Sequence, residues 1–305
     1  MARDPRQVLP CPAPEHHGPA CPYPLGAPDP RRSRWTLAGI QQVCAWLAGY
    51  SRSGVWRLLQ RLDIHWNRGR QHVRSPDPDY VAKLVQVARC AATVQREPRR
   101  QRLLFQDELT YYRQPSVAQG FAAAASAGPR AERSHRANTA TRVVATLDFL
   151  TGQVSAQQAS RIGVRQLLQF YEALVAQTPG VERIYLVQDN WPVHFHPDVL
   201  AALEPQTSPF PWIYPRSWPT EPSARARRLG LPIQLVPLPT YASWTNPIEK
   251  LWRWLKQDVL HHHPWADDLA ELRRQVLAFF DGFARGSPAL LRYVGLAKIP
   301  SEIPP

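Results

Sequence analysis

Long hydrophobic runs are missing from this sequence of 305 residues. A membrane-spanning helix needs about 18 or more consecutive apolar residues, and no such stretch occurs. The first residues also lack the apolar segment of a secretory signal peptide. We therefore expect neither membrane insertion nor secretion, and a cytoplasmic location.

Cysteine is scarce as well, with 4 residues in the whole chain. Cys11, Cys21, Cys44 and Cys90 lack the close spacing of paired zinc ligands and are compatible with a reducing compartment. A disulfide between Cys11 and Cys21 is the less favoured alternative. These few cysteines exclude a disulfide-rich scaffold.

Acidic residues are outnumbered by basic ones, which gives a net charge of +13. The first 100 residues contain 16 Lys and Arg against 7 Asp and Glu, a net of +9, which leaves +4 for the remainder. A basic excess concentrated in one part of a soluble chain favours contact with a polyanion such as DNA.

The basic part begins irregularly and then becomes helical. Residues 1–30 are rich in proline without a hydrophobic period, which predicts an irregular segment. Residues 31–65 predict two helices, because apolar residues recur at helical spacing up to Gly49 and Ser51 can cap a second helix over about 52–62. Two short helices joined by a tight turn are typical of a helix-turn-helix DNA-binding domain, although an ordinary helical hairpin fits the same pattern.

Polar residues on this second helix are candidates for DNA contact, namely Arg52, Ser53 and Arg57. Residues 66–100 then predict a basic linker followed by a helix from about Asp79 to Arg96. In the linker, Arg68 and Arg70 flank a glycine and could enter a narrow minor groove or simply be solvated.

From residue 101 onward, the pattern is that of a mixed α/β sheet flanked by helices. Apolar strands are expected at 102–108, 142–149, 153–159, 184–190 and 233–236, the second and third forming a hairpin about Thr151-Gly152. Helices are expected at 164–177, after Asn246-Pro247, and at 266–283. Residues 204–230, which contain six prolines, read as an insertion that is either disordered or lies over a partner.

Three carboxylates stand at the ends of these elements. Asp107 and Asp189 close apolar strands, and Glu249 lies in the first turn of a helix. Because sites in α/β folds gather where strands end, the three could converge and bind Mg²⁺ or Mn²⁺, and two such ions would suit phosphoryl transfer. The alternative is that they are surface acids, with Glu249 in a capping box that reaches back to Asn246.

The segments that carry these acids resemble known motifs. FQDE at 105–108, QDNWPVH at 188–194 and PTYASWTNPIEKLW at 239–252 resemble the three acidic motifs of the mariner superfamily of transposases, specifically the bacterial insertion-sequence-630 family. The resemblance covers about residues 34–298. It implies a ribonuclease-H-like catalytic domain at 101–300, preceded by the helix-turn-helix region.

Carried over to this chain, the resemblance makes Asp107, Asp189 and Glu249 the metal-binding triad of a DDE transposase. Asp107 would bridge two ions, and the other two acids would hold one each. Such enzymes cut double-stranded DNA at terminal inverted repeats and join the 3′-hydroxyl to a target, commonly at TA. A homodimer on DNA and association with the nucleoid are then expected.

The chain departs from the family pattern in two respects. The interval from Asp189 to Glu249 is longer than usual because of the insertion at 204–230. Members usually carry two helix-turn-helix units, and only one is evident here. Two rival interpretations therefore stay open: a metal-dependent nuclease without strand transfer, and a DNA-binding regulator or inactive transposase remnant.

Residues near the motifs have both functional and plain interpretations. Asn190 and His194 could orient Asp189 or contact phosphate, or could be polar loop residues; Glu108 is expected to be a neighbour. Arg253 and Lys256 fit either a phosphate contact or solvated charges.

The histidine run and the tryptophans are weaker candidates. Side chains of consecutive helical residues point apart, so no metal cage is predicted for His261, His262 and His263. The core is the expected place for most of Trp191, Trp244, Trp252 and Trp254, although an exposed one could stack on a flipped base.

Overall fold

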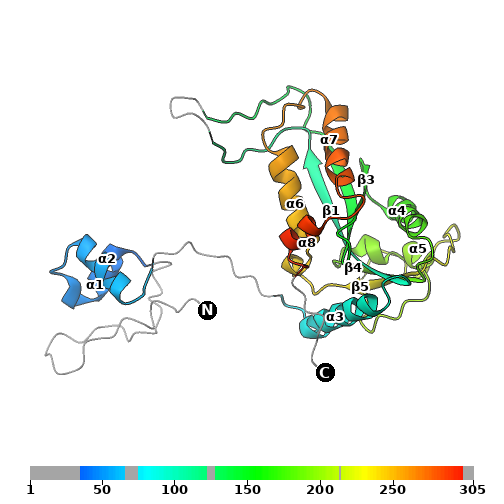
Figure 1. Ribbon diagram of the computed structural model, residues 1–305, viewed down its shortest axis with the longest axis horizontal. Helices are drawn as coiled ribbons and strands as arrows, with labels where there is room; N and C mark the ends of the chain where they lie inside the picture. The colour runs from blue at the N-terminus through cyan, green and yellow to red at the C-terminus, as the bar shows by residue number, and fades with distance from the viewer. Residues whose placement is uncertain (1–34, 66–74, 122–127, 213, 298–305) are drawn as a thin grey trace. The chain divides into compact units, whose positions relative to one another are not determined.

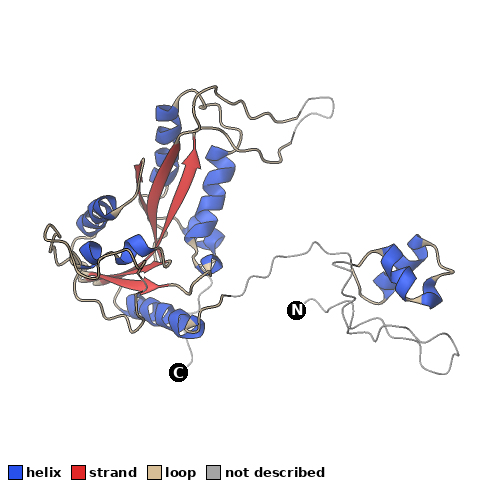
Figure 2. Cartoon of the chain, turned by 180° about the vertical axis from the view of Figure 1, so that it is seen from behind, coloured by secondary structure: helices blue, strands red, loops and turns tan. Residues whose placement is uncertain are grey.

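The computed structural model describes residues 35–65, 75–121, 128–212 and 214–297 (Figures 1 and 2). The irregular segment expected at 1–30 and the linker residues Arg68 and Arg70 lie outside these ranges. The chain divides into two compact units, residues 1–72 and 73–305. Each unit has its own hydrophobic core.

The first unit contains α1 (Leu37–Val43), the 3₁₀ turn η2 (Ala45–Leu47) and α2 (Arg52–Arg61). Thr36 and Ser51 cap the two α-helices by accepting hydrogen bonds from the N–H groups of Gly39 and Gly54, each at 3.1 Å. The first helix is shorter than expected because the backbone leaves helical geometry at Cys44 (φ −95°, ψ 86°). The following 3₁₀ turn still brings Leu47 into the core.

The second unit is built on a five-stranded sheet of order β3-β2-β1-β4-β5. Its strands are β1 (Gln101–Tyr112), β2 (Ala140–Asp148), β3 (Val154–Ala159), β4 (Arg183–Gln188) and β5 (Ile233–Pro237). Strand β2 pairs antiparallel with both β1 and β3, whereas β4 pairs parallel with both β1 and β5. The mixed sheet and the hairpin expected from the sequence are thus confirmed.

Helices cover both faces of this sheet (Figures 1 and 2). They and the short turns are α3 (Tyr80–Arg96), α4 (Val164–Gln177), η3 (Pro192–Phe195), α5 (Pro197–Leu200), η4 (Ser243–Thr245), α6 (Ile248–Leu255), the π-helical turn η5 (Lys256–Leu260), α7 (Leu269–Asp281) and α8 (Pro288–Val294). One core contains residues of α3, α6, α7 and α8, and the other contains residues of α4 and α5.

Alternate residues of β1 belong to different cores. Leu103 and Phe105 pack with the helices α3, α6, α7 and α8, whereas Leu104 packs with α4. Successive side chains of a strand point to opposite faces, so odd-numbered residues of β1 face α6 and even-numbered residues face α4. This alternation separates Asp107 from Glu108.

The helix assigned from the sequence to a linker region, α3, packs on the sheet instead. Cys90, Ala91 and Val94 of α3 are buried in the same core as Leu103 and Phe105 of β1. Asp77, ahead of α3, accepts a hydrogen bond from the N–H of Thr240 at 2.7 Å. The physical reason is the apolar side of this amphipathic helix, which has to be buried.

The insertion at 204–230, where described, folds onto its own chain. Trp212 stacks on Phe195 of η3 with ring centroids 4.4 Å apart. Ser223 donates two hydrogen bonds to Asp198 of α5, from its N–H at 2.6 Å and its hydroxyl at 2.9 Å. The described insertion therefore covers η3 and α5 of its own unit, which neither sequence interpretation anticipated.

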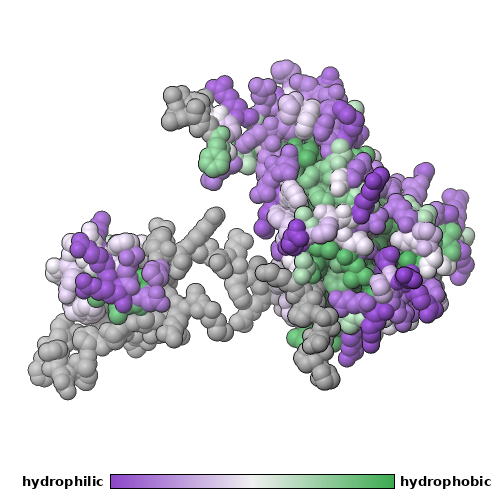
Figure 3. Space-filling view, in the orientation of Figure 1, coloured by the Kyte–Doolittle hydropathy of each residue, from purple (hydrophilic) through white to green (hydrophobic). Residues whose placement is uncertain are grey.

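The outer surface on the face shown in Figure 3 is mostly hydrophilic, with hydrophobic residues gathered in the middle of the second unit. Among the described residues, no helix combines the length and the apolar character needed to cross a membrane.

The hairpin turn between β2 and β3 contacts the start of α8. Gly152 has φ +68°, and a Cβ there would lie 2.6 Å from the carbonyl oxygen of Ser287, the N-cap of α8. The α8 helix in turn contacts α6, where Lys250 donates a hydrogen bond to the carbonyl of Val294 at 2.9 Å. This glycine therefore supports the helix that carries Glu249.

Gly152→Ala is expected to destabilise the protein more than Gly180→Ala. Both glycines have positive φ, which costs an L residue about 1–2 kcal/mol, but a Cβ at Gly180 meets nothing within 4 Å. The overlap at Gly152 should add about 1–3 kcal/mol. Chemical denaturation of both variants measures the difference, and equal losses would contradict the close contact with Ser287.

Candidate metal centre

Asp107 projects from β1 on the side that faces α6. It was predicted at or near a strand end, but β1 continues to Tyr112 because its pairing with β2 extends that far. The parallel pairing with β4 stops earlier, at Phe105 and Val187. Asp107 therefore lies just beyond the end of β4, and the same register brings it beside Asp189, which directly follows Gln188.

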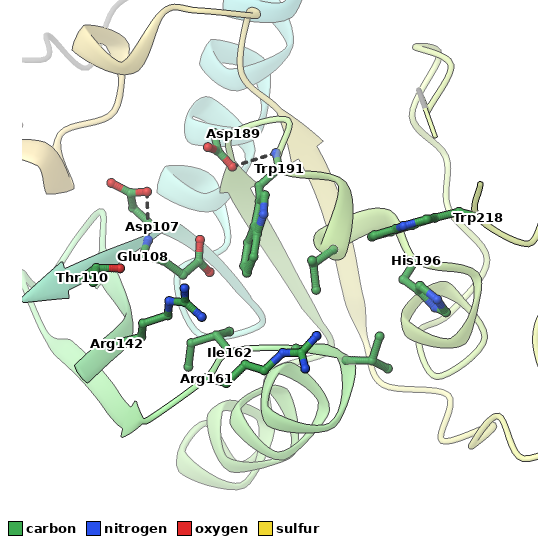
Figure 4. Close-up of a pocket in the computed structure, with 13 residues that line it drawn as sticks. Asp107, Glu108, Thr110, Arg142, Arg161, Ile162, Asp189, Trp191, His196 and Trp218 are labelled. Carbon is green, nitrogen blue, oxygen red and sulfur yellow. Dashed lines mark hydrogen bonds between the residues drawn. The ribbon is translucent and has the colours of Figure 1, made fainter. Parts of the chain in front are cut away.

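The hydrogen bonds of the two aspartates hold their carboxylates in place. Asp107 accepts from the N–H of Glu108 at 2.8 Å through Oδ1 and from the indole Nε1–H of Trp252 at 2.7 Å through Oδ2. Asp189 is exposed and accepts from the N–H of Trp191 at 3.0 Å. Two of these bonds are drawn in Figure 4.

Glu249 lies in the first turn of α6. The start of this helix is attached to β1, because the side-chain amide of Asn246 donates to the carbonyl of Gln106 at 2.9 Å. The backbone N–H of Asn246 donates to Ser243 at 2.9 Å, so it is not the partner of Glu249 that a capping box requires. Since residues three apart share a helix face, Glu249 lies on the same side as Trp252, which contacts Asp107.

Electrostatic interactions link Asp107 with Glu249, and Glu249 with Asp189. Burial raises the pKa of Asp107 to about 7; the bond from Trp252 opposes this, and the charges of Glu249 and Glu108 add to it. Burial also raises the pKa of Glu249, and there the charge of Asp189 adds to the shift while Lys256 and Arg253 oppose it. Negative charge therefore accumulates where these side chains meet.

This environment fits a divalent cation. Burial of a carboxylate near other negative charges disfavours its charged form, and a cation would offset this cost. Carboxylate oxygens are also the ligands that Mg²⁺ and Mn²⁺ prefer. That Asp107, Asp189 and Glu249 are the ligands of such a cation stays a prediction.

A second group lies on the α4 side of β1. His194, fully buried, places Nε2 3.0 Å from Oε1 of Glu108 and Nδ1 3.4 Å from Oδ1 of Asp189. Burial alone would lower the pKa of His194, but the charges of Glu108 and Asp189 and the bond to Glu108 raise it above its usual value.

Glu108, Asp189 and His194 offer ligand atoms within 4.8 Å of one another, so they are an alternative metal site. Asp189 belongs both to this group and to the three acids that the sequence predicts as metal ligands. The sequence analysis did not anticipate the contact of Glu108 with His194. The signal was the two-residue period of strand β1, which places Glu108 on the opposite face from Asp107.

The family of the chain is shown by its sequence. A family model described as DDE superfamily endonuclease matches residues 102–273, more than half of the chain and all of the three motifs. The chain belongs to the DDE superfamily endonuclease family. Among curated proteins, none matches it.

Solved structures with the same fold as the DDE domain come from Mos1 transposase. The Mos1 paired-end complex with left transposon end has 14% sequence identity and a TM-score of 0.54, covering 84% of this chain and 69% of that chain. The Mos1 mariner paired-end complex with Mn has 14% sequence identity and a TM-score of 0.52, covering 88% of this chain and 77% of that chain. The paired-end complex with Mg also has 14% identity and a TM-score of 0.52, and it covers 89% of this chain and 78% of that chain. The expected ribonuclease-H-like fold is confirmed.

Three other residues of the DDE domain were candidates for phosphate contact: Asn190, Arg253 and Lys256. The side-chain amide of Asn190 donates a hydrogen bond to the carbonyl of Leu238 at 2.7 Å, so it holds the segment after β5. A polar loop residue of this kind was one of the two interpretations of Asn190. Arg253 and Lys256 are exposed, and their charges act on Glu249. A phosphate at the carboxylates would thus lie within their electrostatic range.

The histidine run does not form a metal site. His261 bonds to the hydroxyl of Ser116 at 2.8 Å through Nδ1, and Nε2 of His262 accepts from the N–H of Ala118 at 3.0 Å. These two residues hold the segment that follows β1. In the first unit, the predicted DNA contacts Arg52, Ser53 and Arg57 are all exposed on α2.

Asp107→Asn is expected to stabilise the metal-free protein at pH 8. The pKa of this carboxyl is raised from 3.8 to about 7 in the folded state, so the folded protein binds the proton more tightly and loses stability as pH rises through this interval. Removing the charge should raise the thermal midpoint in EDTA by several degrees at pH 8 and change little near pH 4.

Asp258→Asn is the matched control, because this exposed carboxylate also accepts from an indole N–H, that of Trp254 at 2.6 Å. It should show no gain. Thermal denaturation across pH measures both variants, and a lower midpoint for Asp107→Asn at pH 8 would contradict the proposed charge repulsion.

Proposed function

We propose that this protein is a DNA transposase that cuts double-stranded DNA at terminal inverted repeats and joins the 3′-hydroxyl ends to a target, at TA steps. The proposal is supported by the match to the DDE family, by the strand register that sets Asp107 level with Asp189, and by the position of Glu249 in the first turn of a helix attached to β1. The likeness to Mos1 transposase in complex with a transposon end supports DNA as the substrate. Membership of the insertion-sequence-630 branch rests on the resemblance of the three motifs.

The three acids would hold two Mg²⁺ or Mn²⁺ ions, with Asp107 shared between them. When bound, the ions would supply Lewis-acid stabilisation of the charge that develops on the phosphate. The protein's own residues position them: Trp252 and Asn246 fix α6 against β1, and Asp189 is held by the N–H of Trp191. Arg253 and Lys256 would attract the DNA phosphate, and His194 would keep Glu108 neutralised.

A homodimer on DNA is part of the proposal, since two DNA ends have to be joined in one reaction. DNA recognition is assigned to the first unit, through Arg52, Ser53 and Arg57 on α2. The net positive charge of the chain supports such contacts at the DNA backbone. Association with the nucleoid would follow from them.

Asp189→Asn is expected to abolish cutting. With the DNA that flanks the gene as a labelled substrate and Mg²⁺ present, the wild type should nick the repeat end and then join it to a second duplex. Loss of one carboxylate should lower the rate by at least about 10²–10³-fold. Glu182→Gln, an exposed carboxylate in an ion pair with Arg100, is the control and should cut normally.

Nicking without joining by the wild type would instead identify a nuclease. Binding without cutting would identify a DNA-binding regulator or an inactive transposase remnant. Each result would overturn a different part of the proposal, so the two rivals are separated by one assay.

Arg52→Ala and Arg57→Ala are each expected to weaken binding to the repeat end. Each arginine that contacts a phosphate should contribute about one unit to the slope of log affinity against log salt concentration. Fluorescence anisotropy at several salt concentrations measures this slope. Arg292→Ala, which removes a charge from α8, is the control, and an equal effect of all three variants would contradict recognition by α2.

A further inference from the structure

A cavity of about 660 Å³ adjoins the carboxylates, and Asp107, Glu108 and Asp189 all line it. Its walls come from three places: the β1 and β2 strands, the residues that lead into α4, and the segment after β4 (Figure 4). The insertion supplies one further wall residue, Trp218. Asp107 and Asp189 belong to the candidate metal centre, but no role has yet been given to the other lining residues Arg161, His196 and Trp218.

One part of the cavity is suited to an anion. Arg142 and Arg161 both line it and are exposed. Gly163 and Val164 line it as well, where α4 begins without a side-chain cap at its N-terminus. Uncapped N–H groups and the helix dipole add positive potential to that of the guanidinium groups.

Another part of the cavity is lined by aromatic rings. Trp191, His196 and Trp218 face the space, and the rings of His196 and Trp218 lie 5.0 Å apart at 60° (Figure 4). The anchors described above hold Trp218 in place, because the insertion is fixed before it by Trp212 on Phe195 and after it by Ser223 on Asp198. The ion pair of Arg227 with Glu172 of α4 adds a further attachment.

We propose that this cavity binds one unpaired nucleotide of the DNA strand at the reacting end. Its base would pack against Trp218 and Trp191, and its phosphate would lie near Arg161 and the start of α4. The proposal rests on the proposed function, since it takes its ligand to be the DNA on which the carboxylates act.

Size, chemistry and position favour this occupant. Pockets for small ligands measure about 300–1,000 Å³, which admits a single nucleotide. Aromatic rings beside positive charge are the usual combination for unpaired bases, because every base has a face that stacks. Asp107 and Asp189 line the same cavity, so a nucleotide there would adjoin the phosphate at the metal centre. The insertion thus gains a role: it supplies a ring for the base.

The test uses a pentanucleotide of thymidine with one 5-iododeoxyuridine, at about physiological salt and with Ca²⁺ in place of Mg²⁺. Binding to the full chain is measured by anisotropy, and the crosslink formed on irradiation is mapped by mass spectrometry. We expect the crosslink at Trp218 or Trp191. Trp218→Ala should weaken binding by about 5- to 100-fold, and Trp218→Phe, which keeps a ring, should retain most of it.

Arg161→Ala should also weaken binding, whereas Arg165→Ala should not. Both arginines are exposed near the start of α4, but only Arg161 lines the cavity. Thermal denaturation checks that each variant is folded. Unchanged binding in both Trp218→Ala and Arg161→Ala, or crosslinks confined to other regions of the chain, would overturn the proposal.

The failure of this proposal can be told from failure of the proposed function. If the wild type cuts the repeat end and Trp218→Ala binds the oligonucleotide and cuts equally well, the cavity is not a nucleotide site although the protein is a DNA-cutting enzyme. If the oligonucleotide binds and crosslinks as expected while no DNA is cut, the cavity proposal stands and the proposed function falls.

Discussion

The packing of α6 against β1 is the constraint on which the site depends. Two hydrogen bonds define it: the amide of Asn246 to the carbonyl of Gln106, and the indole of Trp252 to the carboxylate of Asp107. The first fixes where the helix begins, and the second fixes its rotation. Glu249 lies between these two residues in sequence, so the same contacts fix the position of its backbone. The apolar residues Ile248, Leu251 and Leu255 bury the rest of the interface.

This arrangement concentrates negative charge in a partly buried place, at a cost to the metal-free fold. The raised pKa values of Asp107 and Glu249 express that cost. On the opposite side of β1, Glu108 and Asp189 have a partner within the protein, because the buried His194 lies between them. One strand thus carries two adjacent acids with different surroundings: Glu108 contacts His194, whereas Asp107 is buried near the charges of other carboxylates.

The fold was predictable because its signals are local. Apolar runs that end in Asp107 and Asp189 indicate neighbouring strands, and Thr151-Gly152 indicates a hairpin turn. The length of β1 was not predictable, since it is set by a partner strand, β2, that pairs beyond the end of β4. The bond from Trp252 to Asp107 and the contact of Glu108 with His194 join residues 145 and 86 positions apart, and no local pattern specifies such pairs. The attachment of the insertion depends on Trp212 and Ser223 in the same way.

The location of the bound ion tests the central claim most directly. A crystal structure of the protein with Mn²⁺, in which anomalous scattering identifies the metal, would show it without reference to activity. The account predicts Mn²⁺ in contact with carboxylate oxygens of Asp107, Asp189 and Glu249 on the α6 side of β1. Mn²⁺ held by Glu108, Asp189 and His194 instead, or no Mn²⁺ at these acids, would contradict it.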